Sequence, residues 1–392
     1  MPPTDPFIGR DILDGQFQII QKIGSGGMGA VYKASQPSMN RMVGIKILHP
    51  KLANRKDLVS RFRREARAMS HLTHPNTVKV FLYGELDDGS LYIVMEYLDG
   101  KNLNQTVRAD GPFPIERALP VLIQACGALD EAHTQGIIHR DLKPENIFLC
   151  QQGGMKDYAK VLDFGLAKVT EREMRPGSVI LTQEGMVFGT PEFMSPEQAQ
   201  GKVLTPGSDI YSLAVILYEV LTGKLPFEAK TAMEYIQAHV NTPPIPIDER
   251  AGKKFPPLLW QTISRALSKD SEARFKTAAD FATAMKAVLA GETVMPATLA
   301  PPPPPSPLPP EVATPVIGQG KVKRAPTPAA ASSRGGARTP MDTKPDRPKS
   351  AMDKVRGEPS RGAPIGLLVG VAAACLILGV LITVVAMKVF VH

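Results

Sequence analysis

The sequence has few cysteines and no leader segment, and each absence narrows the class of protein. Three cysteines, Cys126, Cys150 and Cys375, are too few and too scattered for a disulfide framework or a zinc site. Such usage suits a reducing cytosol. The N-terminus has no basic stretch followed by an apolar run, so we expect no signal peptide. Zinc-finger spacing and RNA-binding aromatic signatures are also missing, so we expect no nucleic-acid partner.

The formal net charge of +8 is concentrated in one segment. Between Lys321 and Arg361, eleven lysines and arginines face only four acidic residues, so the other residues are close to neutral together. This basic segment lies in residues 291–362, which are rich in proline, alanine and glycine. Such a composition cannot bury a core, and it predicts a disordered linker.

Residues 139–146 read His-Arg-Asp-Leu-Lys-Pro-Glu-Asn and match the pattern H-R-D-L-x-x-x-N without a mismatch. Phosphoryl transfer requires an acceptor for the attacking hydroxyl's proton, a cation near the phosphate and a metal ligand. Asp141, Lys143 and Asn146 supply these three groups within six positions. This stretch is therefore the predicted catalytic loop.

A glycine-rich segment between two strand-like runs lies near the N-terminus. Glycines allow a hairpin to fold closely over phosphates, with backbone N–H groups as donors. The same spacing occurs in dinucleotide-binding proteins, but there it opens a helix, whereas β-branched and aromatic residues follow here. The predicted nucleotide cover consists of Ile23, Gly24, Ser25, Gly26, Gly27, Met28, Gly29, Ala30 and Val31.

Two charged residues and one hinge complete the predicted nucleotide site of the first lobe. A strand-like run ends at Lys46, which is expected to bind the α- and β-phosphates. An amphipathic helix over residues 57–69 places Glu65 near its apolar side. Because burying a lone carboxylate is costly, Lys46 is its expected partner. Glu96 and Leu98, at the end of a strand pair, would offer backbone groups to a purine ring.

Asp163 is the second predicted metal ligand, in an Asp-Phe-Gly sequence after a strand-like run. Mg²⁺ prefers oxygen ligands and nucleotide phosphates, so Asn146 and Asp163 fit together chemically. We also expect helices over residues 103–119 and 121–135, and an apolar helix over 210–221.

With these motifs in order from about Phe17 to Leu289, the chain resembles the bacterial eukaryotic-like (Hanks-type) serine/threonine protein kinases. The resemblance implies an α+β, two-lobed fold, with ATP and Mg²⁺, or Mn²⁺ as the alternative, in the cleft. Residues 1–16 would be a lead-in. The kinase domain would span residues 17–290, divided into a β-rich N-lobe (17–98) and a larger helical C-lobe (99–290).

The resemblance also implies roles for single residues. Asp141 would be the catalytic base, and Lys143 would stabilise the transferring phosphate. Thr190 would contact both of them, as in serine/threonine kinases, and protein serine and threonine hydroxyls would be the substrates. Glu197 would pair with Arg274. Further expectations are that Asp209 holds the catalytic loop's backbone, that Gly44, where the family usually has alanine, tunes ATP affinity, and that Thr182 is autophosphorylated with Glu184 adding charge beside Arg140.

Residues 365–387 form a run of 23 residues without a charge. As a helix this run measures about 34 Å, enough for a bilayer core. We therefore expect a transmembrane helix over 363–388 and a short extracytoplasmic tail over 389–392, with no external sensor domain. The basic segment before the helix places the kinase domain in the cytoplasm, at the inner (cytoplasmic) membrane. Gly366 and Gly370 would support a homodimer for trans-autophosphorylation.

Two other classes of protein remain as alternatives. A catalytically dead, kinase-like scaffold is opposed by intact Lys46, Glu65, Asp141, Asn146 and Asp163. A small-molecule phosphotransferase of related fold is opposed by segment 189–197 and by Arg274, which resemble peptide-substrate kinases.

Overall fold

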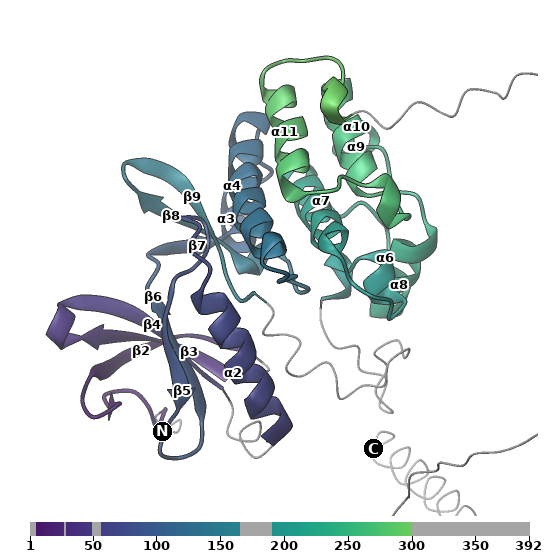
Figure 1. The fold of residues 1–392 in the computed structure, drawn as a ribbon. Helices are drawn as coiled ribbons and strands as arrows, with labels where there is room; N and C mark the ends of the chain where they lie inside the picture. Colours follow the sequence, from purple (N-terminus) through teal and green to yellow (C-terminus); the bar gives the residue numbers. More distant parts are fainter. Residues whose placement is uncertain (1–4, 27–28, 49–55, 165–189, 300–392) are drawn as a thin grey trace, which may run out of the picture. The chain divides into compact units, whose positions relative to one another are not determined.

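The computed structural model describes residues 5–26, 29–48, 56–164 and 190–299, which all belong to one compact unit. The N-terminal part is an antiparallel six-stranded sheet of order β1-β2-β3-β4-β6-β5, with helix α2 packed beside β5 (Figure 1). Its elements are β1 (Asp11–Ile12), β2 (Phe17–Gly26), β3 (Gly29–Gln36), the 3-10 turn η1 (Pro37–Met39), β4 (Arg41–Leu48), α2 (Lys56–Ser70), β5 (Val80–Glu85) and β6 (Leu91–Glu96).

The alternation of side chains along β4 decides where its lysine points. Ile45 and Ile47 belong to an apolar cluster on one face of the sheet. Ile93, which is the register partner of Lys46 in β6, belongs to the cluster on the α2 face. Because strand residues alternate between faces, Lys46 lies on the α2 face, as predicted.

Residues 5–16, predicted as a polar lead-in, pack against the sheet. Ile12 in β1 is buried, and β1 pairs with β2. The Asp5 carboxylate accepts a hydrogen bond from the Tyr32 hydroxyl at 3.1 Å and lies 3.2 Å from Lys22 Nζ. Residues 5–16 therefore stabilise the β2–β3 hairpin.

The C-terminal part is mainly helical, and a small antiparallel sheet of order β7-β8-β9 lies beside α3 and α4 (Figure 1). The α+β, two-lobed architecture is thus as predicted. The elements up to residue 193 are β7 (Gly100–Asn102), α3 (Leu103–Asp110), α4 (Ile115–Thr134), η2 (Pro144–Asn146), β8 (Ile147–Gln152), β9 (Met155–Val161) and η3 (Pro191–Phe193). The later elements are α6 (Pro196–Ala199), α7 (Pro206–Thr222), α8 (Ala232–Asn241), α9 (Ile247–Ala251), α10 (Pro257–Ala266), η4 (Ser271–Ala273), α11 (Ala278–Leu289) and η5 (Ala297–Leu299).

One predicted helix boundary is wrong. The sequence suggested a break at Pro120, whereas Pro120 lies inside α4 and the break falls between Asp110 and Ile115. The physical reason is Gly111, whose φ of 79° ends α3 and whose N–H binds the Val107 carbonyl. The apolar face of α4 then continues through Pro120, with buried residues on both sides of it.

The connection between α2 and β5 is bound to the helical part of the unit. The Glu131 carboxylate, in α4, accepts hydrogen bonds of 2.8 Å from the backbone N–H groups of Thr73 and His74. The carbonyl of Asn76 accepts from the N–H of Val161 at 2.7 Å, at the end of β9. Residues 73–78 are therefore attached to the C-lobe although they precede β5 and β6 in the chain.

The folded unit extends to Leu299, which is buried against the main core and whose carbonyl accepts a hydrogen bond from Arg265. The linker predicted over 291–362 therefore starts too early, because residues 291–299 lead into η5 and place Leu299 in the core. Within the described ranges, no helix is long and apolar enough to cross a membrane. The rest of the predicted linker and the predicted span over 363–388 lie outside the described ranges and stay predictions.

Candidate active site

The loop that begins at His139 is held by one buried carboxylate. Asp209, near the start of α7, accepts hydrogen bonds from the backbone N–H groups of His139 at 2.8 Å and Arg140 at 3.0 Å. Oδ2, which accepts from His139, also lies 2.7 Å from His133 Nε2. Burial acts to raise the pKa of Asp209, but the hydrogen bonds, led by that from His133, hold the pKa below its usual value. The predicted role of Asp209 is confirmed.

Arg140 has a φ of 71°, a left-handed conformation that is uncommon for a residue with a side chain. In this conformation two successive N–H groups converge on the Asp209 carboxylate. The strain of the loop is therefore offset by charge-assisted hydrogen bonds at a buried site.

Asp141 and Lys143 lie together beside the segment that begins at Thr190. Lys143 Nζ is 2.9 Å from Asp141 Oδ2 and 3.4 Å from the Thr190 hydroxyl oxygen. Both charged side chains keep about a quarter of their surface exposed, so a substrate can reach them (24% for Lys143, 29% for Asp141). The predicted contact of Thr190 with the lysine is present.

Asn146 and Asp163, the two predicted metal ligands, lie on adjacent segments. Asn146 Nδ2 donates to the Asp141 carbonyl at 2.7 Å, which fixes the orientation of the carboxamide. The Asn146 carbonyl accepts from the N–H of Leu162 at 2.9 Å, and His139 Nε2 lies 2.8 Å from the Leu162 carbonyl. The loop and the residues before Asp163 are thus joined by two hydrogen bonds.

This donor set fits a magnesium ion that is also bound by phosphates. In the described part of the chain, no group of three or more His, Cys, Asp or Glu side chains could hold a metal alone. Mg²⁺ usually keeps several waters and takes only one or two protein oxygens together with substrate phosphates. The Asp163 carboxylate and the Asn146 carboxamide oxygen match that smaller requirement.

Lys46 Nζ lies 2.8 Å from Asp163 Oδ2, across 117 positions of sequence. Burial acts to raise the pKa of Asp163, but the charge and the hydrogen bond of Lys46 outweigh it and hold the pKa below its usual value. Lys46 is therefore directed into the site, as predicted. Glu65 lies half-buried on α2, and its pairing with Lys46 stays a prediction.

The predicted nucleotide cover is a hairpin of β2 and β3, with Gly26 opposite Gly29. A side chain at Gly29, whose φ is 158°, would collide with the Ile47 carbonyl. This glycine is therefore needed for the approach of β4, a reason that the sequence did not reveal. Gly27 and Met28 lie outside the described residues, whereas Ile23, Gly24, Ser25, Ala30 and Val31 belong to the two strands.

The predicted hinge follows β6. The N–H of Glu96 donates to the Lys79 carbonyl at 2.9 Å, and the binding of a purine by backbone groups of Glu96 stays a prediction. The Glu96 carboxylate accepts from Lys160 Nζ at 2.7 Å and from the N–H of Lys79 at 2.8 Å. Leu98 lies in the connection to β7. The ion pair with Lys160 was not predicted, because a lysine in a strand carries no sequence signal for its partner.

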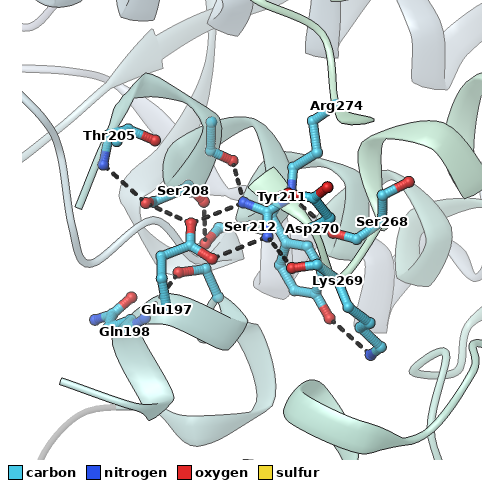
Figure 2. A network of polar contacts seen from close by, with 12 residues as sticks. Glu197, Gln198, Thr205, Ser208, Tyr211, Ser212, Ser268, Lys269, Asp270 and Arg274 are labelled. Atoms are coloured by element: carbon cyan, nitrogen blue, oxygen red, sulfur yellow. Dashed lines mark hydrogen bonds and ion pairs between the residues drawn. The ribbon is translucent and has the colours of Figure 1, made fainter. Parts of the chain in front are cut away.

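Glu197 and Arg274 form the predicted ion pair. Arg274 is completely buried, and its Nη1 and Nη2 lie 2.7 and 2.9 Å from the two oxygens of Glu197 (Figure 2). Ser208 donates to the same carboxylate at 2.6 Å. Burial acts to raise the pKa of Glu197, but Arg274 and Ser208 outweigh it and hold the pKa below its usual value. The pair joins α6, which follows the Thr190 segment, to the loop before α11.

A two-lobed fold with this loop, this lysine and this carboxylate defines a phosphotransferase of the protein kinase class. The sequence model of the protein kinase domain matches residues 17–286. The chain therefore belongs to the protein kinase family, and the resemblance drawn from its motifs is confirmed.

Among curated relatives, the chain is 41% identical to serine/threonine-protein kinase pkn3 of Myxococcus xanthus, over 73% of this chain and 52% of that protein. It is 38% identical to PrkC of Bacillus subtilis, over 70% of this chain and 40% of PrkC. It is 35% identical to PknA of Mycobacterium tuberculosis, over 74% and 65% of the two chains. The chain thus spans between a third and about half of the length of the curated relatives it matches first, and the shared part is a kinase domain of serine/threonine type.

Solved structures agree on the fold. The crystal structure of the Mycobacterium tuberculosis PknI kinase domain matches with a TM-score of 0.54 and 26% identity, over 71% of this chain and 97% of that domain.

Proposed function

We propose that the chain is an ATP-dependent serine/threonine protein kinase tethered to the inner face of the cytoplasmic membrane. The observation that carries the catalytic part is the contact of Lys143 with both Asp141 and Thr190. It brings a proton acceptor and a cation to the segment on which a protein substrate would lie. The intact Lys46–Asp163 pair opposes the alternative of a dead scaffold.

In this proposal Asp141 accepts the proton of a serine or threonine hydroxyl as the oxygen attacks the γ-phosphorus of ATP. A new O–P bond forms while the bond from that phosphorus to the β–γ bridging oxygen breaks, and ADP leaves. Lys143 offsets the negative charge of the transferring group. Mg²⁺ or Mn²⁺, held by Asn146 and Asp163, would neutralise phosphate charge when bound.

Transfer of labelled phosphate from Mg-ATP to dephosphorylated casein tests the catalytic part. The full chain is expected to label serine and threonine but not tyrosine. Asp141→Asn should lower kcat by at least about a hundredfold, the usual contribution of a positioned base, whereas the exposed Asp87→Asn should have no effect. Transfer that survives Asp141→Asn would contradict the proposed chemistry, and transfer to small alcohols but not to casein would favour the small-molecule alternative.

The tether is supported by the run of 23 uncharged residues at 365–387 and the basic segment before it. Membrane fractions of expressing cells should retain the full chain after an alkaline wash, and Leu376→Arg should release part of it, since a central arginine costs about 3 kcal/mol of insertion. A chain that washes off completely would exclude the span. Tethered copies would phosphorylate one another at Thr182, and mixing Asp141→Asn chains with active chains tests this by labelling of the inactive copy.

A further inference from the structure

His239, in α8, is completely buried, and both of its ring nitrogens have partners. Its Nδ1 lies 2.9 Å from the Tyr211 hydroxyl, and its Nε2 lies 2.9 Å from the carbonyl oxygen of Glu192. A carbonyl only accepts hydrogen bonds, so Nε2 must carry the hydrogen. In the neutral ring Nδ1 then accepts, and the Tyr211 hydroxyl must donate. The neutral tautomer with its hydrogen on Nε2 therefore satisfies both ring nitrogens, the Tyr211 hydroxyl and the Glu192 carbonyl.

Lys269 extends this arrangement. Its Nζ lies 3.4 Å from the Tyr211 hydroxyl and 3.1 Å from the carbonyl of Ala238, the residue before His239 (Figure 2 shows the contact with Tyr211). Because an ammonium group only donates, the hydrogen bonds run in one direction, from Lys269 through Tyr211 and His239 to Glu192.

The surroundings keep the imidazole neutral. Burial, reinforced by the charge of Lys269, lowers the pKa of His239 to about 3. The Phe227 ring packs edge-on against the imidazole, with centroids 4.9 Å apart. The ring is therefore fixed in both orientation and protonation at ordinary pH.

The far end of this chain of hydrogen bonds is the catalytic site. Glu192 lies in η3, two residues after Thr190, whose hydroxyl is 3.4 Å from Lys143 Nζ. Lys143 in turn lies 2.9 Å from Asp141. The hydrogen bond to the Glu192 carbonyl thus joins α8 to the segment that contains Thr190, next to the predicted base.

We propose that His239 is a positioning residue, whose Nε2–H holds the Glu192 carbonyl and thereby sets the Thr190 segment for a protein substrate. This inference rests on the proposed kinase function. His239 does not contact the nucleotide site, so it acts on the binding of the acceptor and not of ATP.

Two substitutions separate this role from a merely structural one. Glutamine places an N–H near the position of imidazole Nε2, whereas asparagine reaches only the position of Nδ1. His239→Gln therefore keeps the bond to Glu192, and His239→Asn keeps only the contact with Tyr211. Thr262→Val, in α10, serves as a control, because Thr262 is a buried residue whose hydroxyl bonds only the Leu258 carbonyl in the described part of the chain.

The full chain and its variants are assayed with dephosphorylated casein and Mg-ATP. We expect His239→Asn to raise the KM for casein about tenfold, the equivalent of one lost hydrogen bond, with the KM for ATP unchanged. His239→Gln and Thr262→Val should stay near the parent. Equal effects of Asn and Gln, or a rise in both KM values, would overturn the inference.

Hydrogen–deuterium exchange at the amides of residues 192–195 gives a readout that does not need activity. Exchange there should be faster in His239→Asn than in His239→Gln, because only the former frees the Glu192 carbonyl. If the parent chain transfers no phosphate, the proposed function fails by itself, whereas the exchange comparison still decides the role of His239. Identical exchange in the two variants would contradict it.

Discussion

The ammonium nitrogen of Lys160 lies 2.7 Å from Oε1 of Glu96. This ion pair joins β9, which precedes Asp163, to β6 at the predicted purine-binding hinge. Lys160 is buried and reaches Glu96 across the boundary between the two sheets. The pair therefore couples the position of the hinge to the strand that leads to the metal ligand.

Removing either member of this pair should destabilise the fold. Lys160→Met leaves a largely buried carboxylate without its cation, and a double-mutant cycle with Glu96→Gln should give a coupling energy of about 1–3 kcal/mol in denaturant unfolding. The same cycle at the exposed Lys254–Asp248 pair should give less than about 0.5 kcal/mol. Equal couplings at the two pairs would show that burial does not strengthen the Lys160 pair.

Arg274→Lys should lower stability more than activity per folded molecule. Lysine cannot make the two parallel bonds to Glu197, nor the bonds of Arg274 to the Gly207 and Ser268 carbonyls. A buried carboxylate left poorly paired costs about 3 kcal/mol, or roughly 6–12 °C in Tm for a unit of this size. Calorimetry checks this, with Arg250→Lys at the more exposed Glu228 pair as the control.

Gly44→Ala should be tolerated and should tighten ATP binding. A Cβ at this position would lie 3.4 Å from Met95 Cγ and 3.6 Å from the Glu96 carbonyl oxygen, so it fits without displacing the backbone. The added methyl offers a purine at most about 1 kcal/mol of apolar contact, which corresponds to a KM for ATP up to about fivefold lower. An unchanged KM for ATP would exclude Gly44 as a determinant of nucleotide affinity.

Glu219→Gln should stabilise the protein at alkaline pH. Burial, with the charges of Glu145 and Glu192, raises the pKa of Glu219 to about 7 from 4.5, and Arg108 only partly opposes this. The folded state therefore binds this proton more tightly than the unfolded state does. The resulting stability is fully present below pH 4.5 and is lost as the pH rises through about 7.

The glutamine variant lacks this loss, so at pH 8 it should be more stable than the parent by at most about 3 kcal/mol, with little difference at pH 4.5. Denaturant unfolding at the two pH values measures the change. The exposed Glu116→Gln should show no such dependence. A pH-independent gain from Glu219→Gln would attribute the effect to packing and not to ionisation.

The resemblance to protein kinases, carried by the motifs, implied the parts of the site that touch the reacting groups or hold them directly. The structure contains the expected contact of Thr190 with Lys143, the Glu197–Arg274 pair and the hydrogen bonds of the loop to Asp209, whereas the expected contact of Thr190 with Asp141 stays a prediction. These residue types are prescribed by chemistry, so they leave a recognisable pattern.

Other features depend on three-dimensional packing that no local pattern encodes. Pro120 was expected to end a helix, but α4 continues through it because its apolar face is buried on both sides. The partner of Lys160 and the bond from His239 to Glu192 join elements that are far apart in sequence. Such pairs become visible only when the sheets and helices are assembled.

The attachment of residues 73–78 to α4 and β9 has a consequence for protein engineering. A chimaera that exchanged the small lobe at a single cut near Leu98 would carry this segment with the wrong partner. The backbone groups of residues 73–78 would then meet the residues that the other protein's C-lobe has in place of Glu131 and Val161. The interchangeable module of this enzyme is therefore discontinuous, and a graft that respects it needs additional junctions on either side of the segment between α2 and β5.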